Sequence, residues 1–151
     1  MTTALFTATA KGKFSGGDIT CQCAIGKGGV VQAELKREGD GASPQGQWRM
    51  KRVFYRPDRL ARPQTALPTV PLSATDGWCD APDHPLYNRP VTLPFEPSHE
   101  KLWRDDHVYD LIVELAHNDA PVRPGFGSAV FFKKARKGYR PNEGRRAGWK
   151  N

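Results

Sequence analysis

A chain of 151 residues is long enough to bury one hydrophobic core and too short for two domains of ordinary size. Its 15 glycines, 13 prolines and many aromatic residues favour short strands and ordered loops over a helical bundle. The net charge of +7 resides in residues 133–151, which contain eight basic residues and one acidic residue. Because residues 1–132 are neutral, the net charge is no reason to expect that they bind nucleic acid.

The cysteine count and the hydropathy pattern exclude two further classes. Three cysteines without paired spacing argue against a disulfide framework, and Cys21 and Cys23, two residues apart on a predicted strand, are interpreted as core residues. No stretch approaches the roughly 20 apolar residues of a membrane span. Residues 1–17 lack the basic segment and apolar run of a signal peptide, so we expect no export signal in the chain as written.

The first part of the chain predicts a pair of strands at residues 4–9 and 19–25, joined by a glycine-rich turn at residues 15–18. Apolar residues alternate with polar ones along the second strand, which is typical of a half-buried strand. We therefore expect one covered face and one solvated face in this hairpin.

The middle of the chain alternates between strand and loop patterns. Residues 30–35 predict a further strand, and residues 36–46 are too polar and glycine-rich for regular structure. Residues 47–55 alternate with an aromatic-rich face and predict a strand. Prolines recur through residues 56–97, which indicates a long, folded-over connection without a long helix or a central strand.

The last elements predicted are a helix and two strands. Ser98 is a suitable cap for a short helix through residue 104, residues 108–116 are apolar and β-branched enough for a buried strand, and residues 128–132 form the last one. The sequence therefore predicts a mainly β domain over residues 1–132, followed by a basic C-terminal tail over residues 133–151.

Several segments, found in one order, resemble the YkuD-like L,D-transpeptidase family and look like a compact bacterial subgroup of it. The resemblance covers about residues 23–144. The segments are Gly26–Gly29, Lys36–Trp48, Asp76–Asp80, Tyr87–Val91, Ser98–Asp106 and Gly127–Phe132.

The resemblance implies both a fold and an activity. The fold would be a β-sandwich with one or two short helices and the long proline-rich connection. The activity would be acyl transfer between peptidoglycan stem peptides outside the cytoplasm, without a cofactor. A cysteine thiolate, deprotonated by a histidine, would attack the peptide, release D-alanine and pass the acyl group to an amine.

Two positions depart from the family pattern. Lys133 stands where the family has its histidine, and Arg145 stands where it has its cysteine. Neither side chain is a thiol, and an arginine does not lose its proton at ordinary pH. The family also continues with an apolar strand, which we do not expect from residues 146–150, so the C-terminus looks truncated. We therefore expect the family's fold without its catalytic residues.

The remaining cleft candidates are implied by the resemblance: His117, Asn118, Ser128, Tyr139 and Gly144. For the first two a simple turn is the competing interpretation, because Asn and Asp make local turns.

Other side chains allow weaker hypotheses. Cys79 is an alternative nucleophile, although a structural cysteine is the more common case. Trp78, Tyr87 and Trp103 are aromatic enough to stack on glycan or peptide, but buried anchoring is the commoner use. The four histidines form no metal-binding motif, so no metal is expected.

Two functions from different classes follow. The first is a peptidoglycan domain of this family that is inactive as written. Either a frameshift near codon 145 has altered its C-terminus, or the protein is a true pseudoenzyme. A frameshift there would leave Lys133 unexplained. The second is a binding module whose basic tail holds an anionic polymer, such as wall polymer or nucleic acid.

Overall fold

A computed structural model describes residues 3–136 and the backbone of residues 146–149. In this part of the chain no helix is long and apolar enough to cross a membrane. The only helical element described is the short 3₁₀ helix η1 (Ala33–Leu35). The strands are β1 (Thr7–Ala8), β2 (Lys13–Gly16), β3 (Ile19–Gln22), β4 (Val30–Val31), β5 (Ser43–Pro44), β6 (Met50–Tyr55), β7 (Thr69–Pro71), β8 (Asp76–Cys79), β9 (Pro90–Thr92), β10 (His99–Lys101), β11 (Leu111–Leu115), β12 (Phe131–Lys134) and β13 (Arg146–Trp149).

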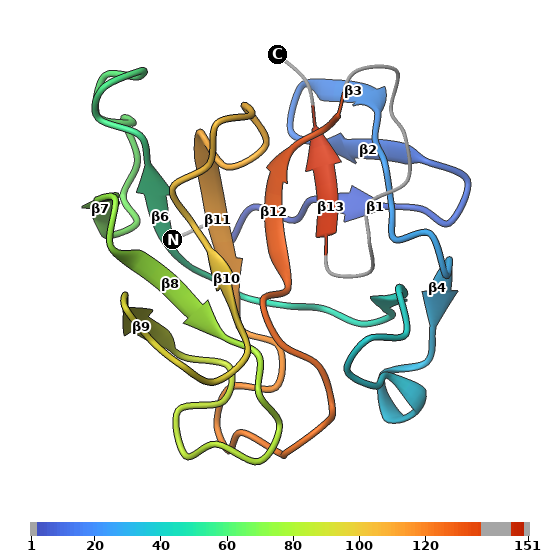
Figure 1. Ribbon diagram of the computed structural model, residues 1–151. Coiled ribbons are helices and arrows are strands. Elements are labelled where there is room, and N and C mark those ends of the chain that lie inside the picture. The colour runs from blue at the N-terminus through green and yellow to red at the C-terminus, as the bar shows by residue number, and fades with distance from the viewer. Residues whose placement is uncertain (1–2, 137–145, 150–151) are drawn as a thin grey trace.

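The largest sheet has five strands in the order β13-β12-β11-β6-β7 (Figure 1). Its three central strands are antiparallel, whereas the pairings of β12 with β13 and of β6 with β7 are parallel. The strand predicted at residues 47–55 is confirmed as β6, although its consecutive residues Val53, Phe54 and Tyr55 are all buried, so both faces of its last part are covered.

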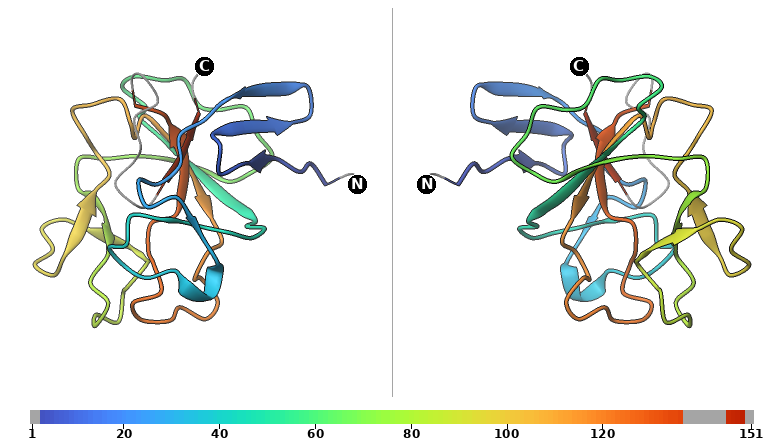
Figure 2. Two further views of the ribbon diagram at one scale, coloured as in Figure 1. Left: turned by 90° about the vertical axis from the view of Figure 1, so that its right-hand side faces the viewer. Right: turned by 90° about the vertical axis from the view of Figure 1, so that its left-hand side faces the viewer.

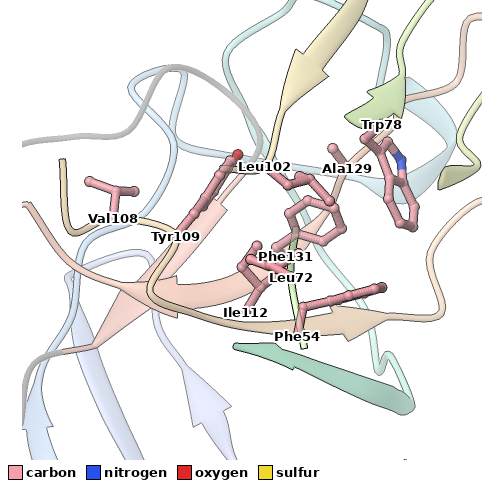
Figure 3. Close-up of a cluster of buried hydrophobic side chains, with 9 residues drawn as sticks. All are labelled: Phe54, Leu72, Trp78, Leu102, Val108, Tyr109, Ile112, Ala129 and Phe131. Carbon is pink, nitrogen blue, oxygen red and sulfur yellow. The ribbon is translucent and has the colours of Figure 1, made fainter. Parts of the chain in front are cut away.

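A second sheet, in the order β10-β8-β9, lies against one face of the first and closes a β-sandwich. The core between them contains Phe54, Ile112 and Phe131 from the large sheet and Trp78 from β8 (Figure 3). The Trp78 and Phe131 rings meet edge to face with centroids 4.9 Å apart, an arrangement that aromatic rings favour. The mainly β fold expected from the sequence is confirmed.

The N-terminal sheet, in the order β1-β2-β3, lies on the other side of the large sheet (Figure 2). Its contact is a run of stacked rings, with Phe6 and Phe14 5.8 Å apart and Phe14 and Phe132 5.1 Å apart. Because side chains alternate along a strand, Phe131 and Phe132 cover opposite faces of β12. The large sheet is therefore covered on both faces at β12.

The hairpin predicted between residues 4–9 and 19–25 was wrong, because β2 lies between β1 and β3 and pairs with both. Three further local predictions were wrong. Residues 98–104 contain β10 instead of a helix, and the Ser98 hydroxyl donates to Asp80 at 2.6 Å instead of capping a helix. Residues 30–35 form only the short β4 followed by η1. Residues 146–149, which we did not expect to be a strand, form β13 beside β12. Both β10 and β13 form because they pair with another strand, and local propensity did not reveal either one.

The proline-rich connection is folded over, as expected, but it contains three strands. β7 joins the edge of the large sheet, and β8 is the central strand of the second sheet. Residues 76–79 contain no proline, so the amides of β8 remain available for pairing. The prediction that no central strand fits this segment was therefore wrong for these four residues.

Candidate functional site

β12 places Lys133 inside the sandwich. The residue is 0% exposed, lies opposite Ile112 of β11 and shares its face of the strand with Phe131. Its Nζ lies 4.6 Å from the centroid of the Tyr109 ring. A cation over the face of an aromatic ring is attracted by its electron-rich face, so the amine and the ring form a cation–π contact.

Tyr109 is also the centre of a wider charged group. Its hydroxyl donates to Glu100 at 2.6 Å, and the Arg104 guanidinium lies 5.4 Å from its ring centroid. Hydrogen bonds from Arg104 lower the pKa of Asp106 to about 2, and the charge of Arg136 acts in the same direction. The groups around Tyr109 thus include the cation Arg104 and the carboxylate Asp106, which bind each other.

A polar cluster lies where the chain enters β12, and Asn88 is its centre. The side-chain oxygen of Asn88 accepts from Trp78 Nε1 at 3.0 Å and from the Ala129 amide at 3.0 Å. Its side-chain nitrogen donates to the carbonyls of His117 at 3.2 Å and Asn118 at 2.8 Å. One buried amide therefore ties β8, the turn after β11 and the segment before β12 together.

Ser128 belongs to the same cluster through a carboxylate. Glu38 accepts hydrogen bonds from the hydroxyls of Ser128 and of Tyr87, the latter at 2.9 Å. The Tyr87 oxygen accepts in turn from the Gly127 amide at 3.1 Å. Burial, reinforced by the charge of Glu38, raises the pKa of Tyr87, so its hydroxyl keeps its proton and acts as a donor.

His117 and Asn118 have different roles in this cluster. Asn118 has φ +48° and holds the following loop through hydrogen bonds to Arg123 and Gly127, so the turn interpretation fits it. His117 is 5% exposed, and its ring meets Trp48 edge to face at 4.8 Å. Burial, followed by the charge of Lys36, lowers the pKa of His117 to about 4, so the ring is neutral at pH 7.

Cys79 lies on β8 with no exposed surface, packed with Ala81 and Val91. Burial raises the pKa of its thiol, which lowers the fraction present as the nucleophilic thiolate. Cys21 and Cys23 are free thiols, half-buried and buried. Among residues 3–136, no three His, Cys, Asp or Glu side chains are grouped so that they could hold a metal ion.

The structure brings three predicted cleft residues together, namely His117, Asn118 and Ser128, and it places Lys133 further along β12. Tyr139, Gly144 and Arg145 lie outside the described residues. Sequence reasoning missed Glu38 and Asn88 as site residues. Both lie in segments that carried the family resemblance, but their partners are 10 to 90 residues away along the chain.

The arrangement offers binding groups more readily than catalytic ones. Ser128 donates to a carboxylate, and Tyr87 has a raised pKa. Lys133 would have to lose its proton to serve as a base, and its amine lies over the ring of Tyr109. The donors and acceptors of the cluster are largely buried and bonded to one another, so the cluster holds the surrounding loops in place.

Comparison with known proteins places this geometry in a family. The family model of the L,D-transpeptidase catalytic domain, YkuD, matches residues 6–149, nearly the whole chain. The comparisons with curated proteins and with solved structures gave no match. The matched region includes the sandwich, the polar cluster and β12, and the expected resemblance is confirmed. The chain belongs to the YkuD family of L,D-transpeptidase catalytic domains, whose members act on peptidoglycan stem peptides.

Proposed function

We propose that this chain is a non-catalytic member of its family that binds peptidoglycan stem peptides without transferring them. The observation that carries the proposal is Lys133, a fully buried residue of β12 that stands at the family's histidine position. A second support is the polar cluster of Glu38, Tyr87, Asn88 and Ser128, which is satisfied by internal hydrogen bonds and rigid enough to shape a binding surface.

The chemistry explains the expected loss of activity. Acyl transfer in this family needs a thiolate to form a thioester while D-alanine leaves, and a base to take the thiol proton. Arg145, at the cysteine position, has no sulfur and is a permanent cation. Cys79, the alternative nucleophile, is buried and has a raised pKa, so it does not support residual activity.

The test is release of D-alanine from a stem tetrapeptide in the presence of an amine acceptor. We expect no turnover for the wild type, for Lys133→His or for Arg145→Cys, because each lacks at least one partner of the cysteine–histidine pair. The double variant is the one protein in this set that contains both residues. Turnover by the wild type would overturn the proposal, and loss of that turnover in Cys79→Ser would identify Cys79 as the nucleophile.

Binding is measured separately on the same protein. Calorimetric titration with the tetrapeptide should give saturable binding that weakens far less with salt than the binding of an anionic polymer to the basic tail. Absence of binding at millimolar peptide would contradict the recognition half of the proposal.

A second candidate is a binding module that holds an anionic polymer through residues 133–151, and the eight basic residues of that segment favour it. The structure reduces the support, because Lys133 is buried within the sheet while Lys134 is exposed. Tail-driven binding would weaken steeply with salt through counterion release. A deletion of residues 137–151 that leaves polymer binding intact would overturn this candidate.

A further inference from the structure

Two arginines contact one aromatic ring on the loops beside the polar cluster. The Cζ atom of Arg37 lies 4.2 Å from the centroid of the Phe126 ring, and the Cζ atom of Arg123 lies 4.3 Å from it. The two Cζ atoms are therefore within 8.5 Å of each other, the sum of these distances. Both arginines are exposed, whereas Phe126 is half-buried. Two cations held this close repel each other, and a bound anion relieves the repulsion.

The local chain fixes the position of Arg37. Its Nη1 donates to the carbonyls of Glu34 and Lys36, each at 2.8 Å, and its backbone amide donates to Asp40 at 2.8 Å. These side-chain bonds use one of the three guanidinium nitrogens. A guanidinium has five N–H donors, so the exposed edge of Arg37 can bind a further acceptor.

Arg123 is fixed through its backbone. Its amide donates to the side-chain oxygen of Asn118 at 2.8 Å, and its carbonyl accepts from the side-chain nitrogen of Asn118 at 2.9 Å. The two loops are joined by the Glu38 amide, which donates to the Gly125 carbonyl at 2.8 Å. The backbones of the two loops that carry the arginines are therefore held together before any ligand binds, which lowers the entropic cost of binding.

Two carboxylates of these loops already hold hydrogen bonds. Glu38 accepts from Tyr87 and Ser128. Asp40 accepts from Lys36 at 2.5 Å and from the backbone amide of Arg37 at 2.8 Å. Neither carboxylate forms an ion pair with the guanidinium group of Arg37 or Arg123 among the salt bridges of the described residues.

We infer that Arg37, Phe126 and Arg123 form a binding site for a free carboxylate of the stem peptide, an inference that rests on the proposed function. Guanidinium groups bind carboxylates through paired, charge-assisted hydrogen bonds, and stacking on a ring holds the fork in the required plane. The site lies on the loops that carry Asn118 and Glu38 of the polar cluster.

The experiment compares a stem tetrapeptide with the same peptide after its carboxylates are converted to amides. Both are titrated calorimetrically into the full chain, into Arg37→Gln and Arg123→Gln, and into Arg62→Gln, a control at an exposed arginine outside the site. We expect the wild type and the control to bind the acid at least about tenfold more tightly than the amide. Each site variant should lose most of this preference while its melting temperature stays unchanged.

Each other outcome contradicts a different part of the inference. Equal binding of acid and amide, or a preference that survives in both site variants, overturns the carboxylate site and leaves stem-peptide recognition intact. Absence of binding by either peptide overturns both. A phosphate-bearing oligonucleotide that loses affinity in the site variants, with peptide binding unaffected, shows that the pair serves phosphate instead. If either glutamine variant melts early, Arg37→Lys and Arg123→Lys, which keep the charge and lose the fork, take its place with the same criteria.

Discussion

Asn88 shows how one side chain can hold the site. It has φ +57°, a value that few residues other than glycine adopt, and it is 5% exposed. Its amide accepts from Trp78 and Ala129 and donates to two carbonyls of the turn after β11. The geometry of the cluster therefore depends on a residue that the sequence did not mark as a site residue.

Asn88→Ala should lower the free energy of unfolding by about 2–6 kcal/mol, because it leaves buried donors on Trp78 and Ala129 without an acceptor, at roughly 1–3 kcal/mol each. Urea unfolding followed by circular dichroism measures the loss. Asn88→Gly removes the same bonds but tolerates the positive φ, so it should be the less damaged of the pair. A loss below 1 kcal/mol in the alanine variant would show that the amide is not the centre of the cluster.

His117 should make the stability of the protein depend on pH. Its pKa is about 4 in the folded chain and about 6.5 in the unfolded chain. Between pH 6.5 and pH 4, therefore, the histidine is protonated mainly in the unfolded state. Stability is therefore full above pH 6.5 and falls as the pH decreases toward 4. Between pH 7 and pH 5 we expect a loss of about 2 kcal/mol.

Urea unfolding of the wild type and of His117→Gln at several pH values between 5 and 7 measures this effect. The difference between the two proteins isolates His117 from the other titrating groups. Equal slopes in the two proteins would mean that His117 titrates normally.

The sequence predicted some of this site and not the rest, for physical reasons. His117, Asn118 and Ser128 were reached through the family resemblance, and they do lie in one cluster. Glu38 meets Ser128 across 90 residues of chain, and no local pattern reports such a contact. The paired contact of Arg37 and Arg123 with Phe126 likewise depends on two loops meeting in space.

At the scale of elements, β12 has two covered faces with different partners. Phe131 packs between the two sheets against Trp78, and Phe132 stacks on Phe14 of the N-terminal sheet. Phe131 is 1% exposed, whereas Phe132 is only half-buried.

Phe131→Ala should therefore cost about 3–5 kcal/mol of stability, because it empties part of a close-packed core. Phe132→Ala, its neighbour on the other face, is the matched control and should cost clearly less, because its surroundings remain partly solvated. Thermal unfolding of both variants measures the difference. Equal losses would contradict the assignment of the two faces.

β13 is the element that the sequence did not suggest. It pairs in parallel with β12 over Phe131–Lys134 and completes one edge of the large sheet. The predicted boundary between residues 132 and 133 falls inside β12.

Removing residues 145–151 should expose the free edge of β12. Its amides that point toward β13 should then exchange hydrogen about tenfold faster or more, the effect of one lost hydrogen bond of roughly 1.4 kcal/mol. Hydrogen exchange by mass spectrometry measures residues 131–134, and residues 50–55 on the far side of β11 serve as the internal control. Unchanged exchange in residues 131–134 would mean that β13 does not protect them.

Local alternation located β6, although its last three residues are all buried, and it was a poor guide where pairing depends on distant parts of the chain. Residues 98–104 carry a suitable helix cap, yet His99 pairs with Cys79 and Lys101 with Gly77. The pattern at residues 128–132 marks β12, but the strand begins later because Ala129, with φ +51°, is held by Asn88. Tertiary hydrogen bonds overrode local propensity at both places.

At the scale of the whole molecule, the two sheets of the sandwich share one core, so they should unfold together. Phe54, Ile112 and Phe131 from one sheet and Trp78 from the other belong to the same cluster. Far-ultraviolet and near-ultraviolet circular dichroism should report a single coincident transition on heating. Two separate midpoints would show that the sheets are independent units.

The register of the large sheet also determines when β6 can pair with β11 during synthesis of the chain. Tyr55 pairs with Leu111, 56 residues later, so β6 has no partner in the centre of its sheet until most of the protein has been made. Ribosomes add about 5–20 residues per second, which leaves β6 waiting for several seconds with an aromatic strand exposed. During synthesis, therefore, β6 remains unpaired on the side of β11 and is open to unwanted contacts until β11 has been made.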